Sequence, residues 1–316
     1  MKTRKKLLWK LMFFSAVLCA WLLMTGKETH AASEWVRIPW GINVGDYASV
    51  RAGGYYFWCN QEQTGPGGRY TIYRAKTEDY ENGERVYTFK ENLRLDIYTN
   101  GEKFFMMDEV EKKGRMYAWM GMTNVEGSGK IKVLMNKRDR TINYPVFYGD
   151  TLYFAYNEFS VIDGAYEGNT KYTTYAMKIG EKAVKKVLKG YVPIKTQGRY
   201  LIVQSDKGSG VYSVYDTKTR KTRKLASQVA SNSLLITTDK YFYYAVEKQA
   251  MYDKKYTYNF YRKKLNGSGK AKKLGRLELK RYPFFYGIND KCVVYDMEYK
   301  KYEYNFKTRK TKKINS

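Results

Sequence analysis

The side chains best suited to chemistry lie in polar segments that follow tyrosine- and phenylalanine-rich runs. The longest of these segments covers residues 157–170, and a shorter one covers residues 108–114. The candidate binding residues in them are Glu158, Asp163, Tyr166, Glu167, Asp108 and Glu109. Carboxylates mixed with an aromatic ring can bind a sugar, a cation or a protein surface. Two carboxylates that face each other could also hydrolyse a glycosidic bond.

Histidine is almost absent. His30 is the single one in the sequence, and it lies beside the expected signal-peptide cut. A mature chain without imidazole cannot use Ser-His-Asp or Cys-His catalysis or a His-containing zinc site. The sequence also has no Asp-x-Asp-x-Asp calcium loop, phosphate loop or dinucleotide fingerprint. We therefore expect no metal, no cofactor and a non-catalytic recognition or scaffold protein. A carbohydrate-active enzyme that uses paired carboxylates is the alternative.

A tight turn followed by a short apolar strand recurs six times. The copies begin at Gly53, Gly101, Gly149, Gly198, Thr238 and Asn289. Each copy leads into a second strand with an aromatic residue at a matching place, then a polar turn and a lysine-rich strand. Four short strands per unit, repeated in this way, are typical of a propeller. The sequence predicts an all-β, six-bladed β-propeller with four-stranded antiparallel blades. Residues 33–52 are expected to supply the first inner strand.

The strands of such a blade, named a to d from the inside outward, place their connections on two faces. We use "b–c face" for the loops at residues 60–68, 108–114, 157–170, 205–210, 247–255 and 296–301. In these loops Asp and Glu outnumber Lys and Arg, whereas lysines crowd residues 218–224, 270–273 and 307–313, called the "basic rim". Variable loops on a rigid frame often carry binding sites. We expect the b–c face to bind a protein or a glycan.

One turn carries a family resemblance. The tyrosine-led strands that run into Asn266-Gly267-Ser268-Gly269-Lys270 resemble low-density-lipoprotein-receptor-type propellers. They are also similar to uncharacterised bacterial propeller families in which an "nldGsgk" turn recurs. The resemblance covers about residues 45–314. It implies the propeller fold and a binding role of unspecified kind, because those families share no single activity.

The first residues predict export. Lys2, Arg4, Lys5 and Lys6 precede an uncharged run at residues 11–24, and Ala31 provides a small residue for cleavage. This layout is typical of a secretory signal peptide. We expect residues 1–31 to be a signal peptide, residues 32–316 to be one propeller domain, and the protein to be secreted or extracytoplasmic. An uncleaved signal anchor is the alternative.

The net charge limits the partners that we expect, and the cysteine positions limit the expected crosslinks. The chain has a formal net charge of +27, which attracts it to anionic surfaces. Export argues against nucleic acid, so we expect an anionic cell-envelope polymer to meet the basic rim. Cys59 and Cys292 fall at strand positions of opposite parity, and we expect no disulfide between them.

Overall fold

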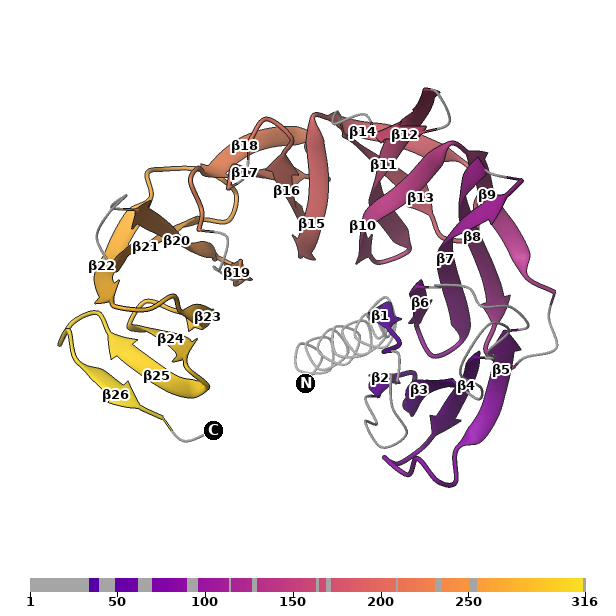
Figure 1. Ribbon diagram of the computed structural model, residues 1–316, viewed down its shortest axis with the longest axis horizontal. Coiled ribbons are helices and arrows are strands. Elements are labelled where there is room, and N and C mark those ends of the chain that lie inside the picture. Colours follow the sequence, from indigo (N-terminus) through magenta and orange to yellow (C-terminus); the bar gives the residue numbers. More distant parts are fainter. Residues whose placement is uncertain are drawn as a thin grey trace, which may run out of the picture. The chain divides into compact units, whose positions relative to one another are not determined.

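The computed structural model describes the greater part of the chain. The described residues are 34–39, 49–61, 70–89, 96–113, 115–126, 130–162, 165–168, 172–208, 210–230, 235–249 and 255–314. Within them the chain is all-β, with its strands arranged in six antiparallel sheets (Figure 1). No helix among these residues is long and apolar enough to cross a membrane. The expected signal peptide, residues 1–31, lies outside the described residues.

Each sheet contains four strands that follow one another in sequence, and we call it a blade. Blade 1 holds β2 (Val50–Ala52), β3 (Tyr55–Gln61), β4 (Tyr70–Ala75) and β5 (Glu84–Phe89). Blade 2 holds β6 (Asp96–Thr99), β7 (Lys103–Lys112), β8 (Arg115–Asn124) and β9 (Lys132–Arg138). Blade 3 holds β10 (Arg140–Tyr148), β11 (Thr151–Ile162), β13 (Thr173–Lys178) and β14 (Val184–Lys189).

The last three blades repeat the same order. Blade 4 holds β15 (Tyr191–Gln197), β16 (Tyr200–Ser205), β17 (Tyr212–Asp216) and β18 (Lys221–Ala226). Blade 5 holds β19 (Ile236–Thr237), β20 (Tyr241–Gln249), β21 (Tyr256–Lys264) and β22 (Lys272–Leu279). Blade 6 holds β23 (Phe284–Ile288), β24 (Cys292–Met297), β25 (Lys300–Asn305) and β26 (Thr311–Lys313). This arrangement confirms the six-bladed β-propeller fold.

Two short strands add to these sheets. β1 (Val36–Arg37) pairs with β6, and Val36 lies opposite Thr99. β12 (Ala165–Gly168) pairs with the C-terminal half of β11. β2 is the innermost strand of blade 1, as expected for the segment that ends at Ala52. Blade 2 therefore carries an additional inner strand taken from the residues before blade 1.

The chain divides into two compact units. Unit 1 comprises residues 1–92, 97–104 and 123–129, and unit 2 comprises residues 93–96, 105–122 and 130–316. In unit 1 the two buried rings of Phe57 and Phe104 meet edge to face, with centroids 6.0 Å apart. The a–b turns also touch there, because a Cβ added at Gly101 would lie 2.6 Å from the backbone nitrogen of Gly53. Only glycine fits this approach.

A β-bulge recurs in the fourth strands of the blades. In the fourth strands of blades 1 to 5, one apolar residue is skipped by the ladder, which is a β-bulge. The skipped residues are Val86, Leu134, Val187, Leu225 and Leu274. Leu225 of blade 4 is 2 % exposed and belongs to a cluster that includes Phe242 and Tyr244 of blade 5. In blade 4 the bulge thus supplies an apolar side chain that packs on blade 5.

Asparagine side chains hold the tight turns between the first two strands of a blade. In the a–b turn of blade 6, the Oδ1 atom of Asn289 accepts the backbone N–H groups of Lys291 at 2.7 Å and Cys292 at 2.9 Å. Asn100 does the same in blade 2. Cys59, which is buried, and Cys292, which is half-buried, are both free thiols.

Candidate functional site

The segment expected to be the longest b–c loop is largely a β-ribbon. The first half of β11, from Thr151 to Tyr156, pairs with β13, and its second half pairs with β12 (Figure 1). The ladder places Tyr166 opposite Val161 and Glu167 opposite Ser160. Paired strands hold their backbone more firmly than an open loop does. Of the predicted residues, Asp163 lies outside the described residues, and for Glu158, Tyr166 and Glu167 only the backbone pairing is described.

Asp108 is a buried carboxylate within β7, which continues to Lys112, so most of the segment expected to be a loop at residues 108–114 is strand. The residue is 5 % exposed, and its Oδ1 atom accepts the backbone N–H of Glu109 at 2.7 Å. Its Oδ2 atom is buried and has no hydrogen-bond partner among the described residues. Burial raises the pKa of Asp108 to about 6, and the nearby charges of Glu109 and Asp96 act in the same direction. Asp108 is therefore ionised at neutral pH at a cost in free energy.

Glu109 reaches the neighbouring blade. Its carboxylate accepts a hydrogen bond from the side chain of Thr141 in β10, and this bond lowers the pKa that partial burial raises. Thr141 is itself buried, and its hydroxyl oxygen also accepts the Nδ2–H of Asn143 at 3.1 Å. A chain of polar contacts from Asn143 through Thr141 thus orients the Glu109 carboxylate.

β10 brings two groups of predicted residues together. In its ladder with β11, Thr141 lies opposite Asn157 and Arg140 lies opposite Glu158. Directly opposed residues in an antiparallel pair have Cα atoms about 4.5–5.5 Å apart. Because Glu109 contacts Thr141, it lies at the base of the β11–β12 ribbon. The structure therefore places Asp108, Glu109 and Glu158 at the same end of adjacent blades.

Arginines missed by the sequence analysis surround this region. Asp139, in the connection between β9 and β10, forms ion pairs with Arg138 at 3.2 Å and Arg115 at 3.6 Å. The guanidinium of Arg140 lies 5.7 Å from the ring centre of Tyr156. The expected acidic character rested on the b–c loops alone and left out the d–a connections, which lie on the same face. The run Arg138-Asp139-Arg140 was the available signal, and this part of the face carries both signs of charge.

The described acidic pair does not have the geometry of a glycosidase. Asp108 and Glu109 are consecutive in one strand, and successive side chains of a strand point to opposite sides. Two carboxylates that act on one glycosidic bond must flank it, about 5–10 Å apart. Among the described residues, no group of three or more His, Cys, Asp or Glu side chains could hold a metal ion. The arrangement is suited to polar recognition.

Comparison with known proteins informs the fold. No protein-family model and no curated protein matches the chain. Among solved structures, it is similar to apo prolyl oligopeptidase B from Galerina marginata, with 10 % identity and a TM-score of 0.52 over 84 % of this chain. The chain spans only 40 % of the length of that protein. It is also similar to the AfRom2 CNH domain, with 10 % identity and a TM-score of 0.36 over 88 % of each chain. At such identities the first similarity shows a propeller-type fold alone.

Proposed function

We propose that the protein is a non-catalytic, extracytoplasmic recognition or scaffold propeller that binds a protein or a glycan through its b–c face. The observation that carries the proposal is the meeting of the β11–β12 ribbon with the acidic residues of β7. Glu109 is oriented by Thr141, and Thr141 lies in the strand that pairs with the base of the ribbon. A preorganised polar surface on a rigid frame loses little entropy when it binds a partner.

The mixed charges of this region favour a partner with both acidic and basic groups, or a hydroxyl-rich glycan. Carboxylates at Asp108 and Glu109 lie on the same face as the arginines around Asp139. The kinship with low-density-lipoprotein-receptor-type propellers and with the bacterial "nldGsgk" families is part of the proposal. We also propose that an anionic cell-envelope polymer binds the basic rim. The formal net charge of +27 supports this partner, because it attracts anionic surfaces.

The test compares two variants in a pull-down from cell-envelope extract at low and high salt. The ribbon variant changes Glu158, Asp163, Tyr166 and Glu167 to Ala. A matched control changes four residues near the opposite strand ends to Ala and removes the same groups: Glu102, Tyr148, Asp150 and Glu181.

We expect a partner that the wild type and the control retain at high salt and that the ribbon variant loses. Salt screens exposed charges, so retention at high salt indicates more than diffuse attraction. If salt releases every partner and the ribbon variant behaves like the wild type, the b–c face does not carry the recognition. Far-ultraviolet circular dichroism of both variants checks that the blades are intact.

A further inference from the structure

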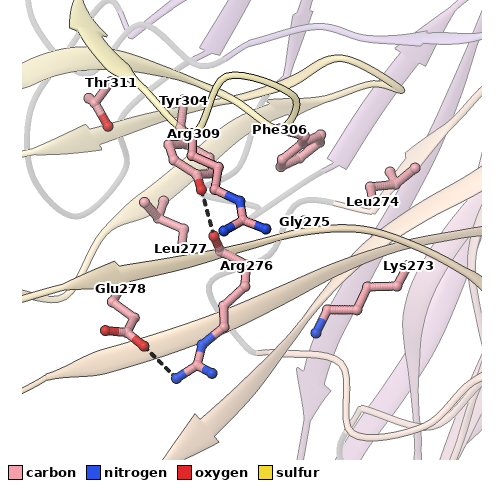
Figure 2. Close-up of a pocket in the computed structure, with 10 residues that line it drawn as sticks. All are labelled: Lys273, Leu274, Gly275, Arg276, Leu277, Glu278, Tyr304, Phe306, Arg309 and Thr311. Carbon is pink, nitrogen blue, oxygen red and sulfur yellow. Dashed lines mark hydrogen bonds and ion pairs between the residues drawn. The ribbon is translucent and has the colours of Figure 1, made fainter.

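A groove lies on the outer side of blades 5 and 6, within unit 2 and outside the b–c face. It has a volume of 740 Å³ and is lined by β22 and by β25, β26 and the turn between them (Figure 2). Ligand sites in proteins commonly have volumes of about 300–1,000 Å³. The groove therefore has room for a small ligand or for a short segment of a polymer.

The bulge in β22 shapes one wall of the groove. Phe260 pairs with Gly275 and Tyr261 pairs with Lys273, so Leu274 is the extra residue. A Cβ added at Gly275 would lie 2.4 Å from Cδ1 of Phe306, so the Phe306 ring packs directly on the Gly275 backbone. The bulge and the glycine together allow an aromatic ring to lie against the strand.

The floor of the groove is aromatic and apolar. Leu277 and Tyr304 are buried, and Phe306 is half-buried. The Tyr304 hydroxyl donates a hydrogen bond to the backbone oxygen of Arg276 at 2.8 Å, which ties β25 to β22 (Figure 2). This floor is rigid, because its polar atom is satisfied within the protein.

The walls are cationic. The lining includes three cations, Lys273, Arg276 and Arg309, and a single carboxylate, Glu278. Glu278 forms an ion pair with Arg276. No carboxylate among the described residues forms an ion pair with Lys273 or Arg309. The groove therefore has an excess of positive charge and two cations free to pair with a ligand.

Arg309 is held in place by its turn. The Oδ1 atom of Asn305 accepts the backbone N–H groups of Lys307 at 3.0 Å and Thr308 at 2.9 Å. The N–H of Arg309 donates to the backbone oxygen of Asn305 at 2.9 Å, and Arg309 has a left-handed φ of 57°. The turn therefore fixes the backbone from which the exposed Arg309 side chain reaches the edge of the groove.

We propose that this groove binds a segment of an acidic polysaccharide. Lys273 and Arg309 pair with its carboxylates, since arginine and carboxylate have matching hydrogen-bond geometry. The half-buried Phe306 provides an apolar surface for a sugar ring, which a site for a simple anion does not need. The inference rests on the proposed function, because it gives the anionic polymer of the basic rim a chemical class and a position.

The experiment uses the full chain and isothermal titration with short oligogalacturonides, at low and moderate salt. The groove variant is Lys273→Ala with Arg309→Ala. The matched control is Lys218→Ala with Arg220→Ala, because Arg220 occupies the same kind of turn in blade 4, with a φ of 57°, and lines no part of this groove. Both variants lose two positive charges and change one left-handed arginine.

We expect the groove variant to bind oligogalacturonide about tenfold or more weakly, because charged hydrogen bonds are lost, and the control to change it about twofold or less. Equal losses in the two variants would show diffuse attraction and overturn the groove. Inorganic polyphosphate provides a second arm. If it binds as tightly as oligogalacturonide and Phe306→Leu weakens neither ligand, the sugar assignment is wrong. The pull-down with the ribbon variant is independent of these outcomes, so a failed groove leaves the b–c face untouched.

Discussion

Replacing Asp108 with Asn tests whether burial of this carboxylate opposes folding. The substitution keeps the shape and the acceptor that the Glu109 N–H binds, but it removes the negative charge at every pH. One unit of pKa corresponds to 1.36 kcal/mol, so a rise from 3.8 to about 6 gives at most about 3 kcal/mol. Asp108→Asn should therefore increase the free energy of unfolding at pH 7.5 by up to that amount.

The pH dependence has a defined sign. The folded state binds the proton of Asp108 more tightly than the unfolded state, so ionisation favours unfolding. Well below the unfolded pKa of 3.8 the residue is protonated in both states and its charge costs nothing. As the pH rises from about 3.8 to about 6 the wild type should lose stability relative to the variant, and well above pH 6 the difference should be constant.

Urea unfolding followed by tryptophan fluorescence, at intervals from pH 4 to pH 7.5, measures this difference. Asp150→Asn is the control, because it removes the same charge from an exposed side chain. The reasoning is refuted if Asp108→Asn is no more stable than this control at pH 7.5, or if its advantage does not shrink at pH 4. Either result would mean that the Oδ2 atom is solvated or paired in solution.

Three further substitutions test how the blades are built. Gly101→Ala should destabilise unit 1 by about 1–3 kcal/mol or more, because Gly101 has a φ of 92° and the new Cβ would meet the Gly53 backbone. Urea unfolding measures the loss. The control Gly54→Ala also has a positive φ but open space around the new Cβ, so it separates the clash from the backbone strain. Leu225→Ala should cost about 2–5 kcal/mol in urea unfolding by leaving a cavity between blades 4 and 5, and a cost below about 1 kcal/mol would show that the bulge residue does not join them. Tyr304→Phe should cost about 1 kcal/mol through the lost bond to the Arg276 carbonyl, with faster amide exchange in β22 as the specific readout; unchanged exchange would contradict that role.

The strand order could be predicted because each blade repeats one local signal. A turn residue followed by a short run of aromatic and apolar side chains marks the second strand of each blade, from Tyr55 in β3 to Cys292 in β24. These patterns depend on neighbours in sequence, so a single sequence reveals them. Four of the five bulges also leave a local pattern, a basic residue before an apolar one, as in Lys224-Leu225 and Lys273-Leu274; in blade 2 Val133 precedes Leu134. A basic residue followed by an apolar one also fits the regular alternation of a strand. The bulge can be recognised only from the pairing with the partner strand.

The candidate site was less predictable for the same reason. The meeting of Glu109 with Thr141 joins residues of different blades, and no local pattern encodes it. The β11–β12 ribbon was read as a loop, although Asp163-Gly164 is a common two-residue hairpin connection. The arginines around Asp139 were missed because the charges were compared for the b–c loops alone, and the d–a connections on the same face were left out.

The grooves of the outer side show how a small turn difference can change a surface. In blade 5 the turn between β21 and β22 contains Gly267, where an added Cβ would lie 2.6 Å from Cβ of Arg223 in blade 4. This turn packs closely, and the groove beside it, lined by Arg223 and Asn266, has a volume of 220 Å³. Blade 6 has Lys307-Thr308-Arg309-Lys310 in place of the glycine turn, and its groove is 740 Å³.

The sequence analysis treated the two kinds of turn as equivalent because both end a strand and both carry lysine. Their backbones differ. Gly267 lets one turn pack on Arg223 of the preceding blade, whereas residues 307–310 of the other turn are exposed and Phe306 before them packs on Gly275. An arginine and an aromatic ring can then line a groove that a glycine turn would fill. The turn type, rather than the number of lysines, therefore distinguishes the two grooves.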